Sequence, residues 1–166
     1  MKTLHLLRHA KSAWNEPGLP DRERGLNKRG RRDAPRMGAA LAAEIAPQGI
    51  FVSPARRARL TLDGLCEGWP ALAACQHTSE EALYTFDAAD LWRWLMAADD
   101  RKPGLFLIGH NPALTELVNE LLGQRQLDNL PTAAYARLGL ALDSWVQLQA
   151  GCGQLERLLP PRQLAG

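Results

Sequence analysis

Two histidines in this chain follow short apolar runs, and an arginine adjoins the first of them. His9 comes directly after Arg8 and the run Leu4–Leu7, and His110 follows the run Leu105–Ile108 closely. Short apolar runs that break into polar residues are typical of buried parallel strands, whose carboxyl ends face the ligand-binding crevice of open α/β sheets. A guanidinium holds phosphate oxygens, and an imidazole can attack phosphorus. The residue types therefore indicate phosphate chemistry, although one such histidine alone would indicate only a strand cap.

A third junction between an expected strand and an expected helix is rich in arginine. The run Ile50–Val52 predicts a short strand, which Ser53 follows as a helix cap and Pro54 as the first helical residue. The opening turn of that helix holds three arginines, Arg56, Arg57 and Arg59. Positive charge in a first turn opposes the helix dipole, so a purely structural role for these arginines is poorly motivated.

The helix expected after His110 has the same design. Asn111 is a suitable cap and Pro112 a suitable first residue, so His110 lies where free backbone N–H groups and the helix dipole favour an anion. If the strands are parallel, all three junctions lie at one edge of one sheet, and two histidines and several arginines converge there. The alternative is that His110 is an ordinary capping residue and that the arginines are solvated.

These motifs resemble those of the histidine phosphatase superfamily. Leu7–Ala10 is similar to its RHG signature with alanine in place of glycine, Ser53–Ala58 to its S-P-x-x-R-A motif, and Gly109–Pro112 to its second-histidine motif. The resemblance runs from residue 3 to about residue 160, and the chain length and the HNP sequence are most similar to the small phosphohistidine phosphatases of the SixA type. Further similar residues are Asp21, Arg24, Leu26, Asn27, Gly30 and the segment Pro131–Ala133.

The resemblance implies a fold and a mechanism. The fold is a single phosphoglycerate mutase-like α/β domain over residues 1–166, a three-layer sandwich whose mostly parallel central sheet is flanked by helices. In the mechanism His9 takes the phosphoryl group as a covalent phosphohistidine, and cationic groups surround the transferring oxygens in place of a metal ion or other cofactor. The residues expected around the phosphoryl group are Arg8, Arg57 and His110, with further substrate contacts from Asn111, Ser12 and Asn15.

A general acid for the leaving group is the least defined part of this mechanism. Glu81, beside Glu80, is the preferred candidate, but a solvated charge at a helix start explains it equally well. A phosphorylated imidazole leaves readily because imidazole titrates at about 6.5, whereas an alkoxide needs a proton. A site with a weak or missing acid is therefore better suited to phosphoramidates than to sugar phosphates.

The sequence thus favours a phosphohistidine protein phosphatase involved in signal transduction. The expected partner is a phosphorylated protein, for which a histidine-phosphotransfer domain is one candidate, or a small phosphoester. The alternatives are a broad small-molecule phosphomonoesterase and a non-catalytic module that binds phosphate or a phosphoprotein. Zinc binding by His5, His9 and His110 is a third alternative, but Arg8 would repel a cation. His5 is expected to be a satisfied core histidine.

Composition limits the remaining functions. The chain of 166 residues carries 20 basic and 18 acidic residues. Its first 60 positions hold 13 basic and five acidic residues, so their formal net charge is +8, and that of the remaining positions is −6. We expect Lys28–Arg36 to be an exposed helix face rather than a nucleic-acid site, because no aromatic interleaving accompanies the charge. No apolar run is long enough for a membrane span, no signal-like region opens the chain, and the three cysteines indicate no disulfide framework, so a cytoplasmic location is expected.

The other elements follow from periodicity and turn residues. Residues 11–26 form a long polar loop after His9, and loops of this length are often functional. Trp14 could pack over the mouth of the site, with Lys11, Ser12 and Asn15 near the phosphate, but ordinary loop residues are an equal alternative. His77 is expected at the surface beside a weak strand candidate, and the tail 160–162 is expected to be frayed. Helices are expected over 27–46, 54–68, from 87 to before 103, and from 111, and strands over 135–142 and 145–149 as a hairpin, with a further strand over 155–159.

Overall fold

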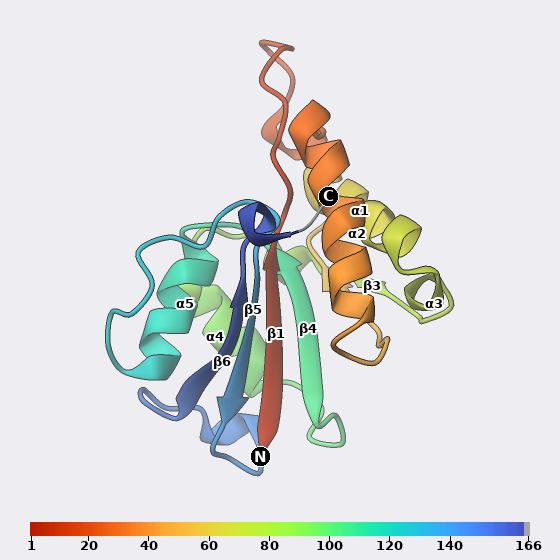
Figure 1. Ribbon diagram of the computed structural model, residues 1–166. Coiled ribbons are helices and arrows are strands. Elements are labelled where there is room, and N and C mark those ends of the chain that lie inside the picture. The colour runs from red at the N-terminus through yellow and green to blue at the C-terminus, as the bar shows by residue number, and fades with distance from the viewer. Residues whose placement is uncertain (165–166) are drawn as a thin grey trace.

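A six-stranded sheet forms the centre of the computed structural model, which describes residues 1–164 (Figure 1). Its order is β3-β2-β4-β1-β5-β6. The first four strands in this order run parallel, β5 is antiparallel to β1, and β6 is antiparallel to β5. The strands are β1 (Lys2–Arg8), β2 (Phe51–Val52), β3 (Thr78–Ser79), β4 (Gly104–Gly109), β5 (Tyr135–Leu140) and β6 (Gly153–Leu159).

Helices cover both faces of the sheet, which confirms the expected three-layer α/β sandwich with a mostly parallel sheet (Figure 1). One layer contains α1 (Lys28–Ala42), α2 (Arg56–Gly68) and α3 (Pro70–Ala73), and the other contains α4 (Ala88–Met96) and α5 (Ala113–Leu122). Four short 3-10 helices complete the secondary structure of the described part: η1 (Asp21–Glu23), η2 (Glu81–Leu83), η3 (Trp145–Gln147) and η4 (Pro161–Gln163). No helix within residues 1–164 has both the length and the apolar character that a bilayer crossing requires.

The central strands β1 and β4 carry apolar residues at successive positions because both of their faces are buried. In β1, Leu4 and Leu6 pack into the cluster with α4 and α5, whereas Leu7 packs into the cluster with α1 and α2. Phe106 and Ile108 of β4 join Leu7 on the same face. Burial on two sides explains why these strands lack the alternation of a half-exposed strand.

The register of the parallel strands brings the three motif junctions to one edge of the sheet. Arg8 is paired with Gly109, and the backbone N–H of His9 donates to the carbonyl of Gly109 at 3.1 Å. The backbone N–H of Ser53 donates to the carbonyl of Ile108 at 3.0 Å. The convergence expected from the sequence is therefore confirmed.

The helix boundaries differ from the expected ones by a few residues. Asn27 caps α1 by accepting a hydrogen bond from the N–H of Gly30 at 2.9 Å, as expected, but the helix ends at Ala42. The second helix begins at Arg56 rather than at Pro54, because Ala55 has a ψ of 138° and is the residue that precedes the first helical turn. The buried Ser53 hydroxyl contacts His110 instead of capping the helix at its expected start. The helix after His110 likewise begins later than expected, at Ala113.

The carboxyl-terminal region corrects two predictions. The expected hairpin about residues 143–144 is wrong: Trp145–Gln147 is the 3-10 helix η3, and β5 pairs with β6 instead. A capping box explains this difference: the Ser144 side chain accepts a backbone N–H of the 3-10 helix, and the Gln147 side chain accepts the backbone N–H of Ser144. The tail is not frayed either, because η4 buries Pro161 and Arg36 Nη2 donates to the carbonyl of Leu164 at 3.0 Å.

Candidate active site

The imidazole of His9 lies at the carboxyl end of β1 with one nitrogen committed and the other free. Its Nδ1–H donates to the carbonyl oxygen of Ala10 at 2.8 Å, which leaves the lone pair on Nε2. Within residues 1–164 no hydrogen bond engages Nε2. Burial lowers the pKa of His9 to about 3, and the nearby guanidinium groups of Arg57 and Arg8 act in the same direction. The ring is therefore neutral at pH 7, and the lone pair of Nε2 is unprotonated and unshared.

His110 lies against His9, with 5.1 Å between the ring centroids. Its Nδ1 is 3.4 Å from Nη2 of Arg57, so this nitrogen is the acceptor, and Nε2–H donates to the Ser53 hydroxyl at 2.7 Å. Burial lowers the pKa of His110 to about 3, supported by the neighbouring His9 and Arg57. Two neutral imidazoles and a guanidinium thus share one small space.

Arg57 is the arginine of the α2 opening turn that enters this space, whereas Arg56 and Arg59 are exposed. Its guanidinium is held by Asp21: Nη1 donates to the Asp21 carbonyl at 2.8 Å, and Nη2 donates to the carboxylate at 3.0 Å. The Arg57 Nε is buried and has no hydrogen-bond partner among the described residues. A donor of the guanidinium is therefore unused.

Asp21 connects the polar loop to the rest of the site. Besides Arg57, its carboxylate accepts hydrogen bonds from Tyr84 Oη at 2.6 Å and from Arg24 Nη2 at 2.7 Å. Partial burial opposes ionisation, but the hydrogen bonds from Tyr84, Arg24 and Arg57 together bring the pKa of this carboxyl well below its usual range. Sequence reasoning did not predict this role, and the only signal was that Asp21 and Arg24 belong to a family-like segment.

Arg8 and Asn111 meet at one carbonyl group. Arg8 Nη1 donates to the carbonyl of Leu130 at 3.0 Å, and Asn111 Nδ2 donates to the same oxygen at 2.9 Å. Asn111 Oδ1 accepts from the N–H of Thr115 at 3.1 Å. The amide of Asn111 thus braces the segment that holds Arg8, and it was expected instead to contact substrate directly.

The two expected contacts from the polar loop are separated in the structure. Ser12 is buried, and its hydroxyl accepts a hydrogen bond from Arg24 Nη1, which places it beside the Asp21 cluster. Asn15 is exposed and, with Trp14, lines a groove between the loop and the first turns of α1 and α2. The structure therefore brings Ser12 to the site and leaves Asn15 outside it.

Glu81, the candidate acid, forms an ion pair at the surface. Arg22 Nη1 and Nη2 donate to its two carboxylate oxygens at 2.5 and 2.7 Å. These hydrogen bonds lower the pKa of Glu81. A proton donor requires the opposite shift, so the pairing does not favour this role.

Two aromatic rings flank His110 and were not identified from the sequence. The ring centroids of Tyr84 and Phe86 lie 5.5 and 5.6 Å from that of His110. Phe86 is 51% exposed, so one of its faces is open at the mouth of the site.

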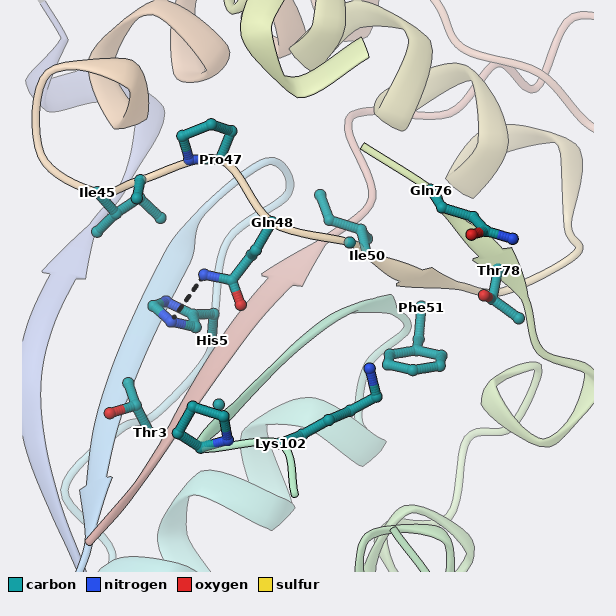
Figure 2. A pocket seen from close by; sticks show the side chains of 14 residues that line it. Thr3, His5, Ile45, Pro47, Gln48, Ile50, Phe51, Gln76, Thr78 and Lys102 are labelled. Atoms are coloured by element: carbon teal, nitrogen blue, oxygen red, sulfur yellow. Dashed lines mark hydrogen bonds between the residues drawn. The ribbon is translucent and has the colours of Figure 1, made fainter. Parts of the chain in front are cut away.

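The other two histidines serve the fold. His5 lies between Phe106 and Tyr135 and its Nδ1 is 2.6 Å from the Tyr135 hydroxyl, so it does not join His9 and His110. It lines a cavity of about 820 Å³ at the amino edge of the sheet (Figure 2). His77 is half-buried rather than at the surface, and both of its nitrogens are bonded, to the N–H of Ile50 and to the carbonyl of Leu72.

The sequence of the chain matches the profile of a known protein family. The sequence profile of the histidine phosphatase superfamily (branch 1) matches residues 4–91, over half of the chain. The chain therefore belongs to the histidine phosphatase superfamily, and it is a phosphatase. A search of curated proteins returns no match.

Several solved structures of phosphatases have a similar fold. The structure assigned as the phosphohistidine phosphatase SixA of Agrobacterium tumefaciens is 25% identical, with a TM-score of 0.79 over 96% of this chain and 98% of that one. The protein histidine phosphatase SixA with bound tungstate is 21% identical (TM-score 0.75, 96% and 97% covered). A mycobacterial glucosyl-3-phosphoglycerate phosphatase is 18% identical (TM-score 0.66, 95% and 98% covered). The protein is thus similar in fold to phosphatases of both protein and small-molecule substrates.

Proposed function

We propose that the protein removes phosphate from phosphohistidine residues of a partner protein, with His9 as the nucleophile. One observation carries the proposal: the Nδ1–H of His9 is fixed on the carbonyl of Ala10, which leaves Nε2 of the neutral ring unshared. The His9 ring lies against His110, which in turn contacts the guanidinium of Arg57. The lone pair of Nε2 forms a bond to phosphorus as the bond from phosphorus to the substrate ring breaks, and that ring leaves as a neutral imidazole because its distal nitrogen has taken a proton from solvent. Water then attacks the phosphohistidine of His9 and releases inorganic phosphate.

Charge stabilisation comes from the groups around His9. Arg8 and Arg57 each retain a buried Nε–H without a partner in the described residues, and both guanidinium groups act electrostatically on His9. An arriving phosphoryl dianion competes with the carboxylate of Asp21 for Arg57 and raises the pKa of His110, which can then donate to an oxygen. Such pre-positioned donors stabilise charge that develops during transfer. No metal ion or other cofactor is part of this proposal.

The loop and the α5 junction complete the proposed site. The Ser12 hydroxyl accepts from Arg24, so its own proton remains to be donated to a phosphate oxygen. Asn111 acts through the carbonyl of Leu130, where it fixes the position of Arg8. Asn15 lines the groove between the loop and the first turns of α1 and α2. In this proposal it contacts substrate only beyond the phosphoryl group.

The leaving group distinguishes phosphohistidine from ordinary phosphoesters. Glu81 is held as a carboxylate by Arg22, so it is not prepared to protonate an alkoxide. The imidazole of phosphohistidine needs little help, because its conjugate acid titrates at about 6.5. The observed pairing therefore supports a phosphoramidate substrate over a sugar phosphate.

Phosphate release from a phosphohistidine protein and from a phosphoserine peptide, measured side by side, tests the proposal. We expect release from phosphohistidine only, and its loss in the His9→Ala variant. Equal release from both substrates would establish a general phosphomonoesterase instead. Release that persists in the folded His9→Ala protein would remove His9 from the mechanism.

A further inference from the structure

A groove of about 610 Å³ lies between the loop that follows β1 and the first turns of α1 and α2. Figure 1 shows this loop rising beyond the carboxyl edge of the sheet, next to the first turn of α1. Three cationic side chains line the groove, Lys28, Arg31 and Arg56, together with the exposed Trp14 and one acid, Glu16. We call these three cations and Trp14 the basic groove.

The basic cluster predicted on one helix face divides into two parts. Arg29, Arg32 and Arg36 gather around the buried carboxylate of Asp33, at 3.4 to 3.9 Å. Their charge therefore serves the fold. The cations of the basic groove have no ionic partner within residues 1–164. Their charge is available to a ligand.

Two of these cations occupy unfavourable positions for helix stability. Lys28 is the first residue of α1 and Arg56 is the first residue of α2. Positive charge at a helix N-terminus opposes the helix dipole, and neither helix has an acid in its first turn to offset it. Helix stability gives no reason for lysine or arginine at these positions.

The basic groove is continuous with the candidate active site. The guanidinium of Arg24 stacks 3.8 Å from the centroid of the Trp14 ring, and the same guanidinium binds Asp21, which holds Arg57. Arg56 also adjoins Arg57 directly in the sequence. Trp14 remains 74% exposed, and a large aromatic ring at the edge of a site is typical of a contact with a partner protein. A substrate segment in the groove would therefore lie next to the place where a phosphoryl group reaches His9.

We propose that the basic groove binds an acidic segment of the phosphorylated protein substrate, next to its phosphohistidine. This rests on the proposed function and adds the chemistry by which the partner is selected. Charge complementarity favours carboxylate side chains, and steering by such charges acts mainly on association. A nucleic acid fits less well, since the groove offers a single aromatic ring for stacking and contains Glu16.

Two phosphohistidine peptides with the same core test this proposal, one flanked by four glutamates and one flanked by four serines. We expect a kcat/KM roughly tenfold higher for the acidic peptide. The difference should arise from a lower KM and should become smaller when salt is added. The double variant Lys28→Glu/Arg56→Glu should lose this preference and still hydrolyse the serine peptide at a rate within about twofold of the wild type. Both changes place negative charge at helix N-termini, so the fold should be retained, as thermal unfolding would verify.

The matched control reverses two exposed charges at the opposite edge of the sheet, Arg101→Glu/Lys102→Glu, and should keep the preference for the acidic peptide. Equal kcat/KM for the two peptides in the wild type, or equal losses in both double variants, would overturn the basic groove. Stronger competition from a single-stranded oligonucleotide than from an unphosphorylated acidic peptide would also overturn it in favour of nucleic acid. If neither peptide is hydrolysed, the proposed function fails, and the groove is tested by binding alone. Fluorescence anisotropy then measures the affinity of a labelled, unphosphorylated acidic peptide for the wild type and for both double variants, and a loss of affinity in Lys28→Glu/Arg56→Glu alone would support the basic groove.

Discussion

His5 lies within β1 and His9 directly follows it, four residues further on, yet the amino and carboxyl edges of the sheet give them different environments. They are almost equally buried, at 6% and 7% exposure, and burial lowers the pKa of His5 to about 4 and that of His9 to about 3. The Nδ1 of His5 is hydrogen-bonded to the Tyr135 hydroxyl. Its Nε2 lies 3.4 Å from the side-chain nitrogen of Gln48 (Figure 2). His9 has one bonded nitrogen and one free nitrogen among arginines.

Neither burial nor a lowered pKa therefore distinguishes the proposed nucleophile, His9, from His5. The amino edge even has the cavity of about 820 Å³, but Lys102 is the one cation that lines it in the described part of the chain. The carboxyl edge instead combines an unshared nitrogen with guanidinium groups whose donors are incompletely used. An unsatisfied nucleophilic atom beside unsatisfied cations is the distinguishing feature.

The largest expected effect is the loss of turnover in His9→Ala. Removing the nucleophile should lower kcat for phosphate release by about 10³-fold or more, because the covalent route disappears. His5→Ala is the matched control on the same strand segment and should keep kcat within about twofold. Steady-state phosphate release measures both, and equal losses in the two variants would abolish the distinction between the edges.

Arg57→Ala should lower kcat by about 10²- to 10³-fold, because one guanidinium stabilises charge on the transferring oxygens. The control is Arg59→Ala, which removes an exposed arginine from the same helical turn and should change kcat by less than about twofold. A comparable loss for Arg59 would indicate that general positive charge, rather than the buried guanidinium, supports the reaction.

His5→Ala should act on stability instead of turnover. The free energy of unfolding should fall by about 1–3 kcal/mol, since the Tyr135 hydroxyl loses its partner and a buried ring is removed. Denaturant titration measures the change, and Tyr135→Phe should cost less because it leaves the imidazole packing in place. Unchanged stability in His5→Ala would contradict the structural role.

Stability should also depend on pH through these buried histidines. Folded pKa values of about 3 to 4 lie below the unfolded value of 6.5, so the unfolded chain binds more protons between these limits. The stability contributed by the neutral rings is complete above pH 6.5 and is lost as the pH falls from there towards 4. Thermal unfolding from pH 7.5 to 5 should show this decline, with a shallower slope in His5→Ala.

The smallest effect is expected for Glu81→Gln. The carboxylate is paired with Arg22 and a phosphorylated imidazole leaves without an acid, so kcat on phosphohistidine should change by less than about threefold. A loss of about 100-fold, the scale of a general acid, would restore Glu81 to the mechanism.

The sequence predicted the central strands and the three junctions because their signals are local and strong. Apolar runs buried on both faces, with polar breaks after them, occur at Leu4–Leu7 and Leu105–Ile108, and Asn27 is a cap that can be recognised from neighbouring residues alone. The boundaries at Pro54 and Pro112 were placed early, because local capping rules cannot register that Ser53 and Asn111 have tertiary partners.

The Asp21 cluster and the carboxyl-terminal strands could not be predicted in the same way. Asp21 contacts residues 36 and 63 positions away, Arg57 and Tyr84, and no local pattern encodes such pairs. The alternation at Trp145–Gln149 resembles a strand, but a capping box at Ser144 and Gln147 turns the chain into η3, so β6 becomes the partner of β5.

The sequence by itself determined the residue types and the places where strands end, and with them the class of chemistry. Only the tertiary structure decided which side chains lie together at the candidate site: Arg57 and not its neighbours, Ser12 and not Asn15, His9 and not His5. The physical reason is that charge, burial and hydrogen-bond satisfaction depend on neighbours in space. These are contributed by α2, the polar loop and β5, which lie far apart along the chain.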